Sequence, residues 1–399
     1  MGILHKKKPT AIIEKGIIED KNGKKYNIDF AGDDNDFVVI SHADEPKKID
    51  DSIKDLFPKK VNQINDICFI NNYNYLLLGS EKGLLYVYKR KINNKSNLKF
   101  DEICHFQPHK QSIIEIIKLS SGHILTLSSD SSSKILEIEI DSNDIIYQNE
   151  KNCKVIQMLL EENESSNNSA IELKSGNIVI SQGYFINFFE KIQNNISSDE
   201  NSKSNNSINN KEFHLTKKIF TNSNNIFFVE IDNKTIAASQ IEKKSLDFYN
   251  LDNYSLSTSI NKIEFSNMKN SMCLINKETL AIGGNNGTIY LVNTLRKQLF
   301  FVSHFDNCEH ISCIKSIDEK TLIMGCQYRN NNYDAIIYKV QDNKFEEIKR
   351  IQKVHKALIN DIKLVTMSIS NNKNPLTENY NVITIGLDYK VKLLLNKNE

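Results

Sequence analysis

The stretch GLDYKVKLLLN (Gly386 to Asn396) combines a turn, an aspartate and a run in which apolar and charged residues alternate. Two earlier stretches have the same shape, GGNNGTIYLVN (Gly283 to Asn293) and GSEKGLLYVYK (Gly79 to Lys89). Each places small residues and a polar turn before a short run with the composition of a β-strand. A unit that recurs in this way along one chain indicates a repeat architecture.

A strand, a tight turn and a second strand precede most of these units. The apolar runs are short, rich in Ile, Val, Phe and Tyr, and interrupted by Asn, Ser, Gly and Asp, as expected for strands and turns. Five examples are SIIEIIKLSSGHILTLSS (Ser112 to Ser129), SAIELKSGNIVISQ (Ser169 to Gln182), IFFVEIDNKTIAAS (Ile226 to Ser239), SMCLINKETLAIGG (Ser271 to Gly284) and SCIKSIDEKTLIMGC (Ser312 to Cys326).

The third strand of each unit ends in a bulky residue, and these residues recur 43 to 60 positions apart. They are Tyr88, Ile138, Phe189, Tyr249, Val292, Tyr338 and Leu394. A fourth strand usually follows, as in LKFDEICHF (Leu98 to Phe106). One such four-stranded sheet cannot bury both of its faces alone, but it can do so between two neighbours arranged radially. The sequence therefore predicts an all-β fold, a seven-bladed β-propeller of four-stranded antiparallel blades.

The ends of the repeat region set the expected domain layout. We predict an N-terminal extension over residues 1–60 and the propeller over residues 61–399, with disordered polar insertions near 193–210 and 370–380. The insertions are either docking arms or tolerated surface growth. The last repeat stops at its third strand, so we expect an N-terminal strand, Phe37 to Ser41 or Lys25 to Phe30, to close the ring. Lys47 to Phe57 reads as a short helix that ends before Pro58.

The repeats resemble those of WD-repeat propellers over about residues 60–396. In that family a His before the first strand, a Ser or Thr in the second, an Asp in the next turn and a Trp in the third form a hydrogen-bonded set. The last repeat supplies His355, Thr384 and Asp388, with Leu394 in place of the Trp. His109 matches the His position of the second repeat, whose turn is irregular. The chain has no Trp, so the resemblance implies blades held together mainly by strand packing.

The resemblance also implies where partners bind. In WD-type propellers the turns between second and third strands surround the central channel and form the usual partner surface. Arg and Tyr are favoured at protein interfaces. The candidate partner-binding residues in these turns are Glu81, Lys82, Asn285, Tyr328, Arg329 and Tyr389. The alternative interpretation is that they are simply exposed turn residues.

Composition narrows the class of protein. Lys and Arg number 51 and Asp and Glu 50, so overall charge gives no reason to expect nucleic-acid binding. Seven Cys occur without a C-x-x-C pair, the N-terminal MGILHKKKPT lacks the apolar core of a secretory signal, and no apolar run is long enough to span a membrane. We therefore expect a cytoplasmic protein in a reducing compartment, with no cofactor.

Other chemistry has weaker signals. CEHISC brings Cys308, His310 and Cys313 together, with Cys326 on the next strand, as possible zinc ligands, but Cys313 falls inside an apolar strand. No Gly-x-Ser-x-Gly element supports a hydrolase. Gly2 followed by a basic cluster is a weak myristoylation signal, because position six is Lys6.

The sequence thus predicts a non-catalytic scaffold that binds proteins or peptides inside the cell. A peripheral membrane adaptor that binds phosphoinositides is the alternative, and a propeller hydrolase is a further one. Membrane binding is not expected from the sequence, because the nearest approach to a basic pair for lipid headgroups is TLRKQL (Thr294 to Leu299).

Overall fold

The computed structural model describes residues 15–19, 25–30, 38–42, 53–55, 64–70, 74–91, 99–139, 153–161, 165–192, 212–224, 226–266, 268, 270–341, 344–366, 380–388 and 390–394. They form two compact units, residues 1–51 and 52–399. All regular structure in the described residues is β-strand. Within this part of the chain, no helix is long and apolar enough to cross a bilayer.

The first unit contains one small antiparallel sheet. Its strand order is β1 (Lys15–Glu19), β2 (Lys25–Phe30) and β3 (Val38–His42). The two segments that were predicted to close the propeller therefore pair with each other. Residue pairs such as Asn27 with Ser41 and Ile28 with Ile40 join β2 to β3. The prediction that Phe37 to Ser41 or Lys25 to Phe30 closes the ring is wrong.

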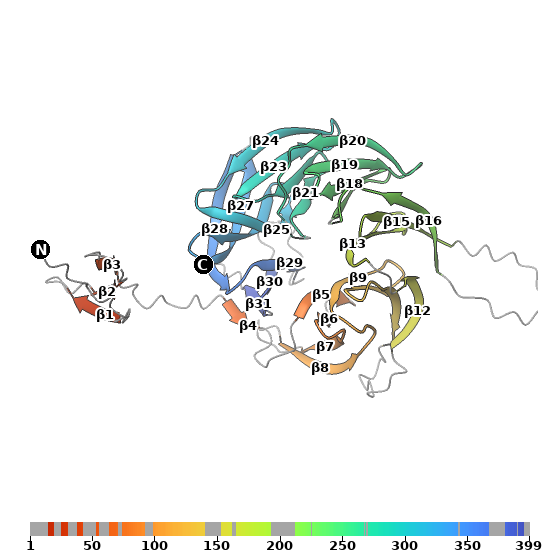
Figure 1. The fold of residues 1–399 in the computed structure, drawn as a ribbon. Helices are drawn as coiled ribbons and strands as arrows, with labels where there is room; N and C mark the ends of the chain where they lie inside the picture. Colours follow the sequence, from red (N-terminus) through yellow and green to blue (C-terminus); the bar gives the residue numbers. More distant parts are fainter. Residues whose placement is uncertain are drawn as a thin grey trace, which may run out of the picture. The chain divides into compact units, whose positions relative to one another are not determined.

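The second unit is a β-propeller of seven four-stranded antiparallel blades, as the sequence predicts (Figure 1). Blade 1 contains β5 (Ile64–Ile70), β6 (Tyr75–Ser80), β7 (Leu85–Lys91) and β8 (Lys99–Phe106). Blade 2 contains β9 (Ile113–Lys118), β10 (Ile124–Ser128), β11 (Ser133–Ile138) and β12 (Cys153–Leu160). Blade 3 contains β13 (Asn167–Glu172), β14 (Ile178–Gln182), β15 (Phe185–Lys191) and β16 (Phe213–Phe220). Blade 4 contains β17 (Phe228–Asp232), β18 (Thr235–Gln240), β19 (Ser245–Asn250) and β20 (Ser255–Asn261).

The remaining blades follow the same plan. Blade 5 contains β21 (Met272–Asn276), β22 (Thr279–Gly283), β23 (Thr288–Asn293) and β24 (Gln298–His304). Blade 6 contains β25 (Cys308–Asp318), β26 (Thr321–Tyr328), β27 (Tyr333–Gln341) and β28 (Lys344–His355). Blade 7 contains β29 (Ile359–Thr366), β30 (Tyr380–Gly386), β31 (Val391–Leu394) and, from the N-terminal side of the chain, β4 (Ile53–Asp55).

The core consists of seven apolar clusters, and each cluster lies between two neighbouring blades. The second strand of blade 1 shows how this arises. Leu76 and Leu78 pack against blade 7, whereas Leu77 packs against blade 2. Because successive side chains of a strand point to opposite faces, a strand buried on both faces reads as a continuous apolar run. This explains runs such as Tyr75–Ser80, which do not alternate with polar residues.

The small residues at the ends of the second strands have a steric cause. A Cβ atom on Gly79 would lie 2.8 Å from Cγ2 of Ile113, on the first strand of the next blade. One on Gly283 would lie 2.7 Å from Cγ2 of Ile311, in the corresponding place of blade 6. The recurrent glycine therefore lets the inner strand of the next blade approach closely.

The ring closes through β4, which pairs antiparallel with β31 at the outside of blade 7 (Figure 1). Ile53 is opposite Leu394, and Lys54 is opposite Leu393. This strand lies inside Lys47 to Phe57, so the predicted helix is wrong at these residues. An extended segment can pair with the open backbone edge of β31, which a helix cannot do. The closing strand lies within residues 1–60 and belongs to the compact unit of residues 52–399. The predicted insertions near 193–210 and 370–380 lie outside the described residues.

Two truncations test this closure. Removal of residues 1–51 leaves β4 in place, so we expect little change in the thermal midpoint. Removal of residues 1–58 takes β4 away and exposes the edge of β31, which should lower the midpoint and promote aggregation. Differential scanning fluorimetry and light scattering measure both effects. Equal stability of the two truncated proteins would contradict the assignment of β4 as the closing strand.

Candidate functional site

Two blades contain a buried polar network centred on a histidine. At the entry to blade 7, Nδ1 of His355, the last residue of β28, donates to Oδ1 of Asp388 at 2.9 Å, and Nε2 lies 2.9 Å from Oγ1 of Thr384. The backbone amide of Lys356 donates to the other oxygen of Asp388 at 2.9 Å. The structure thus brings together the three residues that the resemblance pointed to in the last repeat.

Blade 2 has an equivalent network, of which only the histidine was predicted from the sequence. Nε2 of His109 lies 2.8 Å from Oγ1 of Thr126, and Nδ1 lies 3.2 Å from Oδ2 of Asp130 and 2.9 Å from Oγ of Ser132. Thr126 and Asp130 are four residues apart, as are Thr384 and Asp388. This shared spacing was the signal that could have identified the network despite the serine-rich turn.

Hydrogen bonding lowers the pKa of both aspartates. For Asp130, burial by itself would raise the pKa, but hydrogen bonds from Ser132 and Lys110 and the proximity of His109 lower it from 3.8 to about 2. For Asp388, burial again opposes ionisation, and the bonds from His355, Lys356 and Lys390 lower the pKa to about 2. Both carboxylates therefore stabilise the fold in their ionised form.

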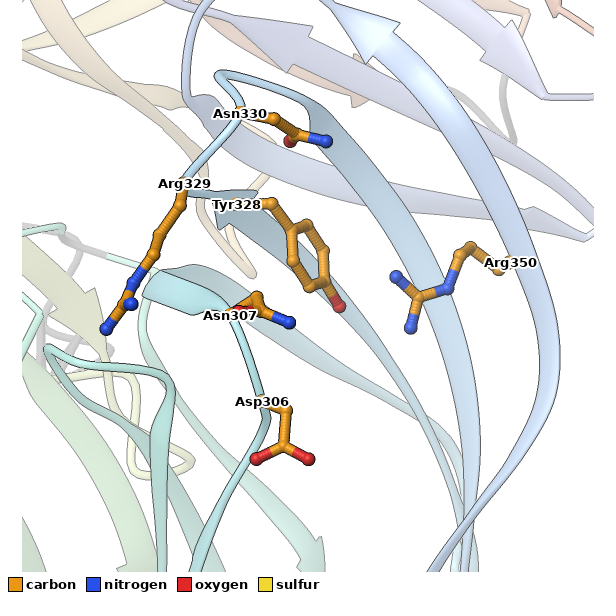
Figure 2. A pocket seen from close by; sticks show the side chains of 6 residues that line it. All are labelled: Asp306, Asn307, Tyr328, Arg329, Asn330 and Arg350. Carbon is orange, nitrogen blue, oxygen red and sulfur yellow. The ribbon is translucent and has the colours of Figure 1, made fainter. Parts of the chain in front are cut away.

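The candidate binding site is a pocket of about 420 Å³ on the turn surface of blade 6. Asp306 and Asn307 come from the turn between β24 and β25, and Arg329 and Asn330 from the turn between β26 and β27. Tyr328 is the last residue of β26, and Arg350 lies on β28. Figure 2 shows the ring of Tyr328 pointing toward Arg350, whereas Arg329 extends on the other side of the turn.

Backbone hydrogen bonds hold the two turns together. The amide of Arg329 donates to the carbonyl of Asn307 at 3.1 Å, and the amide of Asn331 donates to the carbonyl of Tyr328 at 2.9 Å. Asn307 and Asn331 adopt φ values of 58° and 55°. Asn tolerates this left-handed conformation better than most residues, which favours these tight turns.

Arg350 forms one wall of the pocket and is already paired. Its Nη2 and Nε atoms donate to the two carboxylate oxygens of Glu347 at 2.6 and 3.0 Å, and its Nη1 atom lies 3.5 Å from Asp334. The guanidinium carbon lies 4.9 Å from the centre of the Tyr328 ring, within cation–π range. Glu347 raises the pKa of Arg350, and Arg350 lowers the pKa of Glu347, so this pair stays charged.

Arg329 and Asp306 differ from Arg350. Both side chains are exposed, and among the described residues neither forms an ion pair or a side-chain hydrogen bond. The pocket therefore offers a guanidinium, a carboxylate and the amides of Asn307 and Asn330 to an incoming group. Such an arrangement suits a polar or charged side chain of a partner, since charge-assisted hydrogen bonds to Arg are strong and directional.

The other predicted partner residues lie elsewhere. Glu81 and Lys82 form the corresponding turn of blade 1, and Asn285 that of blade 5, so the structure does not join them to the blade 6 pocket. Oδ1 of Asn285 is 2.9 Å from Nδ1 of His310, which links blades 5 and 6. Tyr389 lies outside the described residues. The pocket residues that were not predicted from the sequence are Asp306, Asn307, Asn330 and Arg350, of which Arg350 lies far from the predicted turn in the sequence.

The cysteines and histidine that were considered as zinc ligands, Cys308, His310, Cys313 and Cys326, do not form a metal site. Cys313 lies in the apolar cluster between blades 6 and 7, where burial raises the pKa of its thiol to about 12. In the part of the chain that the structure describes, no group of three His, Cys, Asp or Glu side chains could hold a metal ion.

A second cavity of about 540 Å³ lies in the central channel, against the first strands of the blades. Several of the charged groups that line it already form ion pairs or hydrogen bonds within the protein. Nζ of Lys363 lies 2.7 Å from Oδ2 of Asp361, and Oδ2 of Asp66 accepts the amide of Ile116 at 2.7 Å. We therefore regard the blade 6 pocket as the better candidate site.

Comparison with known proteins supports the architecture. No protein-family model matches the chain, and no curated protein matches it. Among solved structures, the crystal structure of the Saccharomyces cerevisiae Sqt1 is similar, with a TM-score of 0.58 and 11% sequence identity over 86% of this chain and 98% of that one. At this identity the likeness shows the fold alone. The hydrogen-bonded networks at His109 and His355 are observed in this structure itself. The chain is a seven-bladed β-propeller.

The histidine networks of this propeller should contribute to its stability. Asp130→Ala and Asp388→Ala each remove a buried or largely buried acceptor and leave several donors unpaired, so each should cost about 1–3 kcal/mol of unfolding free energy. Lys82→Ala is the matched control, because Lys82 occupies the corresponding turn position of blade 1 and is exposed. Its effect should be about 0.5 kcal/mol or less. Urea unfolding measures all three, and equal effects would show that the networks add nothing to stability.

The same carboxylates predict how stability changes in acid. Because the pKa values of Asp130 and Asp388 are lowered in the folded state, their stabilisation is complete above about pH 4 and is lost as the pH falls toward 2. The double variant Asp130→Asn/Asp388→Asn should be less stable at pH 6 and should lose less stability between pH 4 and pH 2. Urea midpoints across this range provide the test, and parallel curves for variant and parent would refute it.

Proposed function

We propose that the protein is a non-catalytic scaffold that binds protein or peptide partners in a cytoplasmic assembly. The observation that carries the proposal is the blade 6 pocket, in which Arg329 and Asp306 are exposed and uncommitted while the backbone around them is fixed. A rigid site loses little conformational entropy on binding, so it supports affinity from few contacts.

The remaining features fit a binding module in a reducing compartment. All seven cysteines are free, as is usual for intracellular proteins. Arg is frequent among the residues that dominate binding energy at interfaces, and Arg329 is exposed in the turn of blade 6, whereas Tyr328 is buried beneath Arg350. On this proposal Arg329 pairs with an acidic group of the partner, and Asp306 with a basic one or with a hydrogen-bond donor.

Affinity purification of the tagged protein, with quantitative mass spectrometry, tests this function. Arg329→Glu should reduce the recovery of specific partners by roughly tenfold or more, since it replaces attraction by repulsion at the pocket. Asp306→Lys should act in the same direction. Lys277→Glu is the control, because Lys277 is exposed in the turn between β21 and β22 and undergoes the same change of charge.

The outcome depends on stability as well as recovery. The three variants should keep the thermal midpoint of the parent, because the changed side chains are exposed. An unchanged set of partners with Arg329→Glu would remove the blade 6 pocket from the proposal.

A further inference from the structure

A cluster of exposed aromatic rings lies at the outer end of blade 3, far in the sequence from the blade 6 pocket. Tyr184 is 43% exposed and Phe220 is 66% exposed, and their ring centres are 6.2 Å apart. The ring of Phe185 lies 5.6 Å from that of Phe220 in an edge-on arrangement. We refer to Tyr184, Phe185 and Phe220 as the aromatic corner. Large exposed aromatic side chains in one place mark interaction sites more often than scattered ones do.

The backbone beneath the aromatic corner is well fixed. Phe185 and Phe220 are opposite each other in the pairing of β15 with β16. The amide and the hydroxyl of Thr221 both donate to the carbonyl of Tyr184, at 2.7 and 2.9 Å. The rings are therefore presented to solvent by a rigid strand end.

The aromatic corner continues into a basic strand. β16 is the outermost strand of blade 3 (Figure 1), and residues 214–218 are all exposed. The strand contains Lys217 and Lys218 and no acidic residue. Nζ of Lys218 lies 4.0 Å from the centre of the Phe185 ring, so the charge reaches the aromatic corner. Leu215, 49% exposed, adds a second apolar position.

The edge of β16 already binds one amide group. The side-chain amide of Gln157, on β12, accepts a hydrogen bond from the amide of Phe213 at 2.9 Å and donates one to the carbonyl of Phe213 at 2.6 Å. This is the pair of bonds that a residue of an adjacent antiparallel strand would make. Beyond Phe213, the described residues contain no strand that pairs with this edge.

We propose that β16 binds an acidic, extended segment of a partner protein as a fifth strand of blade 3. The segment's backbone would continue the pairing that Gln157 begins, its carboxylates would face Lys217, and an apolar side chain would pack on the aromatic corner. Addition of a peptide strand to an open edge is a general mode of recognition, in which the backbone gives affinity and the side chains give specificity.

A protected edge or a membrane contact would account for this surface less well than a peptide does. Lysines often protect an open edge against aggregation, but Phe220 and Leu215 on the same strand would defeat that purpose. An anionic membrane could accept the phenylalanine and the lysines, but its hydrocarbon core offers no hydrogen-bond partners and its headgroups offer no ordered row of donors and acceptors to match the strand backbone. A peptide satisfies the charge, the apolar surface and the open edge together. Among the described outer strands, β16 is also the one that combines lysines, an exposed aromatic ring and no acid.

Purified full-length protein and fluorescent synthetic peptides provide the test. The probe is a peptide of about ten residues in which glutamate and valine alternate, with phenylalanine at both ends. Its lysine counterpart should bind at least about tenfold more weakly. N-methylation of every second residue, made in both phases, should abolish binding in one phase, because it removes the hydrogen-bond donors that face β16. Fluorescence anisotropy measures each affinity.

Substitutions test whether the peptide binds at β16 and the aromatic corner. Phe220→Ala and Lys217→Glu should each weaken binding by about tenfold. Leu256→Ala on β20 and Lys344→Glu on β28 are controls that should not change it, since Leu256 is similarly exposed at 50% and Lys344 is an exposed lysine of another outer strand. Thermal midpoints verify that all four variants are folded.

Several results would overturn the proposal. These are no saturable binding of the glutamate peptide, equal binding of the lysine peptide, indifference to N-methylation in both phases, or unchanged affinity of the Phe220→Ala and Lys217→Glu variants. Binding to vesicles of phosphatidylserine and phosphatidylcholine that depends on Lys217, without peptide binding, would replace the peptide by a lipid surface. The test does not involve Arg329, so it can fail or succeed independently of the proposed function.

Discussion

The burial of each blade between two neighbours is the interaction on which the propeller depends. No blade has a core of its own, because the apolar clusters lie at the joints between blades. Leu76 and Leu78 contribute to one joint while Leu77 contributes to the next, so every second strand is shared between two clusters. An open ring would leave two blade faces exposed to water, and closure at blade 7 is therefore a requirement of stability.

Polar bonds across the joints supplement this packing. Glu172 of blade 3 accepts the amide of Ser120 in blade 2, and Glu230 of blade 4 accepts the amide of Lys174 in blade 3. Glu115 in blade 2 accepts the amide of Ala170 in blade 3. Such bonds satisfy backbone groups of the inner strands and of the turns that follow them, which have no partner within their own blade. The histidine networks tie the chain that enters blades 2 and 7 to the turn between the second and third strands, since His109 precedes β9 and His355 is the last residue of β28 in blade 6.

Because the joints between blades and the inner strands stabilise the fold, the turns and the outer strands are open to binding. The core joints and the inner strands hold the frame, whereas Arg329 in a turn and Phe220 on an outer strand contribute little to it. Surface positions on a rigid scaffold can therefore carry recognition without loss of stability. The two proposed sites would bind by different interactions. The turn site would use charged side chains, whereas the edge of β16 would use unpaired backbone groups.

The sequence by itself determined the blades, because hairpins, turns and apolar runs are local features that repeat along the chain. The resemblance of the last repeat to WD-repeat propellers also pointed to the network of His355, Thr384 and Asp388. Tertiary structure decided which segment closes the ring. The pattern of residues 47–57 predicts a helix, but Ile53 pairs with Leu394. The edge of β31 lies more than 300 residues away in the sequence, so local patterns could not predict this pairing. The pocket likewise required Asp306, Tyr328 and Arg350 to come together from separate elements, and only the tertiary fold places such distant residues around one pocket.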